Sequence, residues 1–134
     1  IFAIKYAPVE TNRHLTIFHN PFVHSMHDLI IIGGGPAGIA AGVYASRKRL
    51  KTLFITKEWG GQSTVSPDIH NWIGTVTISG NDLAKSLENH LKAYAENVVD
   101  IIDNTLVTNA TKTENGFQVT LENGTTHEAR ALFV

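Results

Sequence analysis

Three glycines, Gly33, Gly35 and Gly38, have the spacing G-x-G-x-x-G and are the residues with the clearest chemical meaning. Between a strand and a helix, the first glycine permits a tight turn and the second lets the backbone approach a pyrophosphate. The third lets the helix lie close to the strand. Pro36 suits the first helical turn and Ala37 continues it. Backbone N–H groups and the positive end of the helix dipole would then face the phosphates. The pattern predicts a dinucleotide site at residues 33–38.

The flanking residues predict the elements that position this turn. Residues 29–32 are four large apolar residues in a row, which indicates a strand buried on both faces. Residues 36–48 have a helical pattern rich in small residues, and residues 51–56 form the second strand of a β-α-β unit. The basic end of the helix, residues 47–49, suits the negative end of its dipole, which we favour over a phosphate-binding patch.

The end of the second strand is where a dinucleotide fingerprint places an acidic residue for the ribose hydroxyls. Thr56 stands there, followed by Lys57 and Glu58. A hydroxyl can bond one ribose oxygen whereas a carboxylate can bond both, so this departure weakens a general NAD-binding interpretation. Glu58 can take over the role if the loop folds back.

A long loop without regular periodicity follows, containing Gly60, Gly61, Gln62 and Asn71. Such a loop inside a compact domain is usually functional. The two glycines would allow backbone next to a flat ring, and Gln62 offers an amide to the edge of a heterocycle. A plain turn with a core tryptophan explains the loop equally well, so both interpretations stay open.

The remainder predicts covering elements and no chemistry. Ser79 and Asp82 resemble a capping box, and the helix behind them should reach about residue 96 with an apolar stripe of Leu83, Leu87, Leu91 and Tyr94. His90 and Lys92 are expected to be solvated. Residues 98–102 form a short strand, and residues 106–111, 116–121 and 125–129 form antiparallel strands joined at Asn-Gly pairs. Residues 131–134 begin another core strand.

Composition excludes several functions. The 134 residues are 43% hydrophobic and 17% charged, as in an ordinary soluble globular protein, and the net charge of −1 offers no field for nucleic acid or a membrane surface. A cytoplasmic location is expected. No apolar run approaches the ~20 residues of a membrane-spanning helix. There is no cysteine, hence no disulfide and no thiolate nucleophile. No catalytic residue and no metal site are predicted.

Residues 1–26 differ from the rest and are expected to be a leader or extension, loosely ordered. Prolines and asparagines break any periodicity, and four histidines fall at spacings that match no metal-ligand pattern. The only methionine, Met26, is the expected natural start, so residues 27–134 are expected to be the domain.

Three linked motifs resemble the thioredoxin reductase family of flavoproteins: Ile32 to Gly38, Gly60-Gly-Gln62, and Asn71-Trp-Ile-Gly74. They occur in the order and at about the spacing of that family, over residues 27–134. Thr56 is similar to the low-molecular-weight branch, where a hydroxyl often replaces the acid. Ile73 stands where relatives usually have proline.

The resemblance implies an α/β, Rossmann-like FAD-binding domain with a parallel sheet, covering helices and a small antiparallel β-meander. Residues 33–38 would hold the FAD pyrophosphate, Thr56 with Lys57 and Glu58 the ribose, and residues 60–62 with Asn71 the flavin. The domain is expected to be incomplete, since the nicotinamide domain, the cysteine pair and the later flavin-binding motif are not in this sequence.

The implied parent enzyme passes reducing equivalents from NAD(P)H through FAD to a disulfide of a thioredoxin-like or peroxiredoxin-type protein, and can be a homodimer. A ferredoxin–NADP reductase of the thioredoxin reductase type and a truncated, non-catalytic nucleotide-binding module remain as alternatives. A self-contained NAD dehydrogenase is disfavoured. The chain alone is expected to be inactive.

Overall fold

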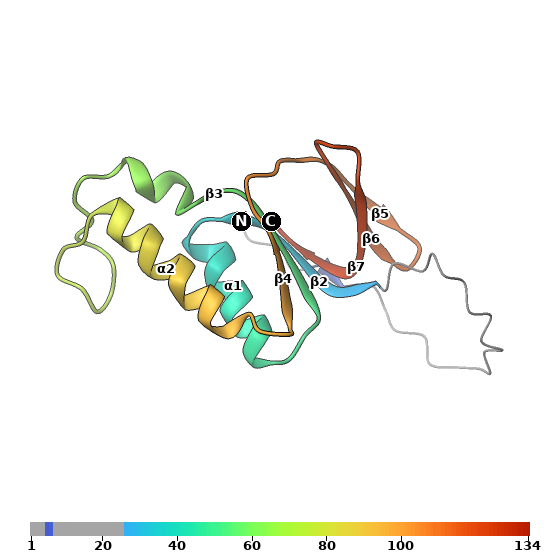
Figure 1. Ribbon diagram of the computed structural model, residues 1–134, viewed down its shortest axis with the longest axis horizontal. Helices are drawn as coiled ribbons and strands as arrows, with labels where there is room; N and C mark the ends of the chain where they lie inside the picture. Colours follow the sequence, from blue (N-terminus) through green and yellow to red (C-terminus); the bar gives the residue numbers. More distant parts are fainter. Residues whose placement is uncertain (1–4, 7–25) are drawn as a thin grey trace.

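The computed structural model describes residues 5–6 and 26–134, and its centre is a parallel sheet (Figure 1). Strands β2 (His27–Gly34), β3 (Thr52–Trp59) and β4 (Val99–Ile102) run parallel, with β3 in the middle. Helix α1 (Pro36–Arg47) connects β2 to β3. Ile30 and Ile31 are both fully buried, so adjacent residues face opposite covered sides of the sheet. The predicted β-α-β unit is confirmed.

Two α-helices cover one face of this sheet. Helix α2 (Gly80–Tyr94) follows a short 3-10 helix, η1 (Gly61–Val65), and packs beside α1 (Figure 1). The predicted cap is confirmed, because the Asp82 amide donates to Ser79 Oγ at 3.1 Å. The core on this side contains a set of buried apolar residues: Ile31, Ile39, Val43, Phe54 and Leu91. The predicted stripe is wrong at Tyr94, which is 47% exposed in the last turn of α2.

An antiparallel meander covers the other face. It consists of β5 (Val107–Thr113), β6 (Gly116–Leu121) and β7 (Thr126–Phe133). Buried residues of β6 pack in one cluster with buried residues of β2 and β3, so the sheet curls until its antiparallel part faces its parallel part: Val119 and Leu121 meet Ile30, Leu53 and Ile55. The sequence-based expectation of a parallel sheet with covering helices and a meander is confirmed.

Strand β7 joins the two parts, and here the sequence-based prediction of two separate strands is wrong. Residues 126–129 pair antiparallel with β6, while residues 129–133 pair parallel with β2. No glycine or proline interrupts β7, so the chain continues without a turn. The resulting strand order is β4-β3-β2-β7-β6-β5.

The segment before Met26 is described only at β1 (Lys5–Tyr6), which pairs antiparallel with Leu132 and Ala131 of β7. The rest of the expected leader, residues 1–4 and 7–25, lies outside the described residues, so the boundary at residue 26 stays a prediction. In the described ranges, no helix has the length and apolarity needed to cross a membrane. The same ranges contain no cluster of three or more metal-ligating side chains suited to an ion.

Candidate dinucleotide site

The glycine turn joins β2 to α1 at the carboxyl end of the parallel strands. Gly33 has φ +113°, a conformation that favours glycine, and so makes the tight turn. A Cβ on Gly38 would lie 2.0 Å from the Gly33 carbonyl oxygen, so helix α1 can lie this close to the turn only with glycine there. The predicted turn and packing roles of these two glycines are confirmed.

Gly35 has a different environment from its two neighbours in the motif. Its φ of −74° is open to any residue, and a Cβ built on it meets no atom within 4 Å. The fold itself therefore does not require glycine at this position. Gly35 is also the N-cap of α1, no side chain caps that helix, and Pro36 occupies its first turn. The amino end of α1, with Ala37 in its first turn, is left open toward the space in front of Gly35.

A second glycine turn lies directly against the first. The Gly60 amide donates to the Gly34 carbonyl at 2.8 Å. Gly60 and Gly61 have φ of +84° and +52°. A Cβ on Gly61 would lie 3.4 Å from Gly35 Cα. The structure thus brings two motifs together that are 25 residues apart in the sequence.

The end of β3 differs from the expected ribose site. Thr56 is only 2% exposed, and its hydroxyl donates to the Glu58 carbonyl at 2.6 Å. The exposed side chains at this strand end are Lys57 and Glu58, and Lys57 Nζ lies 3.8 Å from Glu122 Oε1. Of the predicted trio, Glu58 therefore offers the accessible carboxylate for a pair of hydroxyls.

The residues predicted to contact the flavin lie farther apart than the two glycine turns do. Gln62 follows the second glycine turn in η1 and is exposed. Asn71 lies farther out, in the loop closed by a bridge between Ile69 and Ile78, which projects beyond the amino end of α2 (Figure 1). Residues 70–76 of this loop surround a hollow of about 390 Å³. Residues 33–38 and 60–61 are therefore in contact with each other, whereas Asn71 lies on a separate loop.

Residues from distant segments also border the site, and sequence reasoning missed them. Ala84 of α2 packs against Gly60, since a Cβ added to Gly60 would lie 2.4 Å from the Ala84 Cβ. Glu122, in the turn between β6 and β7, accepts the Leu106 amide at 3.1 Å and reaches Lys57. No local sequence signal marks either residue, because both arrive through tertiary packing.

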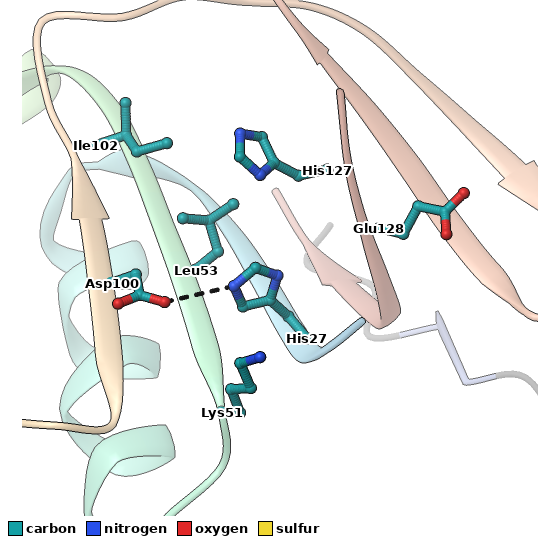
Figure 2. Close-up of a pocket in the computed structure, with 7 residues that line it drawn as sticks. All are labelled: His27, Lys51, Leu53, Asp100, Ile102, His127 and Glu128. Carbon is teal, nitrogen blue, oxygen red and sulfur yellow. Dashed lines mark ion pairs between the residues drawn. The ribbon is translucent and has the colours of Figure 1, made fainter. Parts of the chain in front are cut away.

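A second hollow, of about 350 Å³, lies at the opposite edge of the sheet, near the amino ends of β2, β3 and β4 (Figure 2). His27 Nε2 lies 3.5 Å from Asp100 Oδ2, and the His27 and His127 rings are 6.4 Å apart at an angle of 62°. Leu53 and Ile102 add an apolar lining. None of the predicted site residues lines this hollow, so it is separate from the glycine turns.

The fold and the paired glycine turns define a Rossmann-like dinucleotide-binding domain. Residues 27–134 match the family model described as pyridine nucleotide-disulphide oxidoreductase. The chain belongs to this family.

Relatives within the family are known by sequence and by structure. The chain is 32% identical over 108 residues to a component of alkyl hydroperoxide reductase from Staphylococcus epidermidis and to its counterpart from Staphylococcus aureus, covering 81% of this chain and 21% of those proteins. It is similar in structure to the thioredoxin reductase of Lactococcus lactis, with 27% sequence identity and a TM-score of 0.72 over 79% of this chain and 34% of that one. It is also similar to the thioredoxin reductase of Streptococcus pyogenes, with 33% identity and a TM-score of 0.70 over 80% of this chain and 34% of that one. The chain spans about a fifth of the former proteins and a third of the latter.

Proposed function

We propose that this chain is the FAD-binding part of a thioredoxin-reductase-like flavoenzyme. The observation that carries the proposal is Gly35, where the fold leaves open space and an unrestricted backbone. A glycine that the protein's own packing does not require is explained by the close approach of a pyrophosphate. The adjoining Gly60-Gly61 turn supports a dinucleotide that continues past its phosphates.

The residues present fit FAD. Backbone amides of residues 33–38 would hold the pyrophosphate at the amino end of α1, because the helix dipole favours negative charge there. Glu58 would bond the ribose hydroxyls, with Lys57 beside it and Thr56 shaping the strand end. Gly60, Gly61 and Gln62 would lie along the flavin, and Asn71 would reach it if its loop closes. When bound, FAD supplies two-electron chemistry, and this chain binds and orients it.

The reaction of the whole enzyme is proposed by analogy with two relatives. Two named relatives are an alkyl hydroperoxide reductase component and a thioredoxin reductase. By analogy, the whole enzyme would pass reducing equivalents from NAD(P)H through FAD to the disulfide of a thioredoxin-like or peroxiredoxin-type protein. Its nicotinamide site and thiols would be supplied outside this chain, which has no cysteine. A cytoplasmic location and a homodimer are part of the same proposal.

A thermal-shift comparison of FAD, FMN, NADH and NADPH tests the assignment. FAD is expected to raise the melting temperature most, because it alone can use the phosphate turn and the Gly60-Gly61 turn together. FMN lacks the adenosine diphosphate half and serves as the matched control. Weak affinity is expected, since the chain spans about a third of the thioredoxin reductases that it resembles. A larger shift with NADH or NADPH than with FAD would refute the flavin assignment.

A further inference from the structure

Trp59, the last residue of β3, makes contacts that the dinucleotide motif does not explain. Its ring stacks on Phe54 with centroids 5.6 Å apart and planes 8° from parallel. Lys92 Nζ of α2 lies 5.2 Å from the centre of the same ring and forms an ion pair with Glu88. Lys92 is exposed, as expected, and its ammonium has these two partners in addition to water. A half-buried tryptophan is held between the sheet and α2.

The end of β3, where Trp59 lies, is not a regular strand. In a regular strand, residues five apart point to opposite faces, so Phe54 and Trp59 would not meet. From Ile55 to Trp59, however, β3 contains two more residues than the stretch of β2 from Ile32 to Gly34 with which it pairs. Regular alternation is lost over this irregular stretch, and the Trp59 ring lies beside Phe54 in the cluster on the side covered by the helices.

Trp59 is joined directly to the second glycine turn. The next amide, that of Gly60, donates to the Gly34 carbonyl inside the phosphate turn. Gly60 is confined on its other side by Ala84 of α2, where an added Cβ would come within 2.4 Å of the Ala84 Cβ. Gly61 then comes against Gly35. The direction in which the chain leaves Trp59 thus sets where both glycine turns meet.

We propose that Trp59 is a positioning residue for the dinucleotide site, anchored by Phe54 and by the Lys92 ammonium of α2. It acts through the Gly60–Gly34 hydrogen bond and has no contact with the ligand in this role. The inference rests on the proposed function for its ligand and on the described contacts for its mechanism. Groups that bind a ligand keep their geometry only when packed neighbours lock them.

Trp59→Leu, Trp59→Phe and Leu53→Ala form the set of variants. Leu53 is buried on the face of β3 that packs against the meander, so Leu53→Ala lowers stability and leaves the Trp59–Phe54 stack in place. Trp59→Leu is expected to weaken FAD binding by about tenfold, measured by flavin fluorescence well below each melting temperature. Leu53→Ala should leave the affinity within about twofold, and Trp59→Phe should restore it. Equal affinity losses in Trp59→Leu and Leu53→Ala would overturn the proposal.

A second measurement needs no ligand. Hydrogen exchange of the Gly60 amide reports on its bond to Gly34, with the Val119 amide in β6 as an internal reference. Trp59→Leu should speed Gly60 exchange relative to Val119, and Leu53→Ala should not. Unchanged Gly60 exchange in Trp59→Leu would refute the positioning role. If the unmodified chain binds no FAD, the proposed function fails, and the exchange result still decides the role of Trp59.

Discussion

Alanine at Gly35 and alanine at Gly38 are the same chemical change three residues apart, and the structure predicts opposite outcomes. At Gly38 the new Cβ would lie 2.0 Å from the Gly33 carbonyl oxygen and 3.1 Å from its carbon. Both atoms belong to the backbone, so neither can rotate away. At Gly35 the new Cβ meets nothing within 4 Å, and the backbone angles there suit alanine.

The geometry gives the size of each effect. Cβ atoms essentially never come within 3.0 Å of such a neighbour, so Gly38→Ala must move the start of α1 by about 1 Å. Overpacking of this kind costs about 1–3 kcal/mol, which lowers the melting temperature by roughly 4–12 °C in a domain of this size. Gly35→Ala changes only an N-cap preference, worth less than about 1 kcal/mol.

Thermal unfolding followed by circular dichroism, together with FAD titration, measures both variants. Gly35→Ala should keep its melting temperature within about 4 °C of the unmodified chain and lose FAD affinity, because its methyl group occupies the approach to the phosphate. The main expected effect of Gly38→Ala is a lower melting temperature. If Gly35→Ala bound FAD as well as the unmodified chain, the assignment of the phosphate site would be wrong. A Gly38→Ala variant of unchanged stability would refute the packing argument.

Three further outcomes are expected. Ser79→Ala removes the acceptor of the Asp82 amide and should destabilise the chain by about 1 kcal/mol in urea unfolding; no change would show that the cap is dispensable. Deleting residues 1–25 removes the two-residue pairing of β1 with β7 and should lower the melting temperature by only a degree or two, whereas a larger loss in a thermal scan would move the domain boundary. Because the chain has no cysteine to attack a disulfide, it should show no NADPH oxidation that depends on a thioredoxin-type disulfide in the presence of FAD, and disulfide-dependent turnover at 340 nm would contradict the proposal that this chain only binds and orients FAD.

Local rules recovered the parts of this fold that local physics decides. Gly33 and Gly38 are required by backbone geometry within a few residues, so their spacing alone predicted the turn. Ser79 and Asp82 are three residues apart, and their hydrogen bond depends on little else. The Asn-Gly pairs likewise placed the meander's turns close to where β5, β6 and β7 are joined.

What the sequence could not predict depends on partners far along the chain. Thr56 was expected at a ribose, but the irregular end of β3 turns its hydroxyl onto the Glu58 carbonyl. Lys92 is exposed as expected, but its contact with Trp59 was not predicted, because it depends on α2 packing beside the end of β3. Whether residues 125–129 and 131–134 form one strand was decided by the two neighbours that share it, β6 and β2.

That shared strand has a consequence for how the chain is made. β2 pairs with β3 on one side and on the other with β7, whose partner residues lie about a hundred positions later, as in His27 with Ala129. During synthesis from the amino end, β2, β3 and α1 emerge long before β7. One edge of the apolar strand β2 therefore stays unpaired until β7 has been made. An exposed apolar edge is a template for wrong pairing between chains. Synthesis at elevated temperature, or a stall before residue 126, should therefore yield aggregates held through β2, and a chaperone that shields strand edges would raise the yield of folded protein.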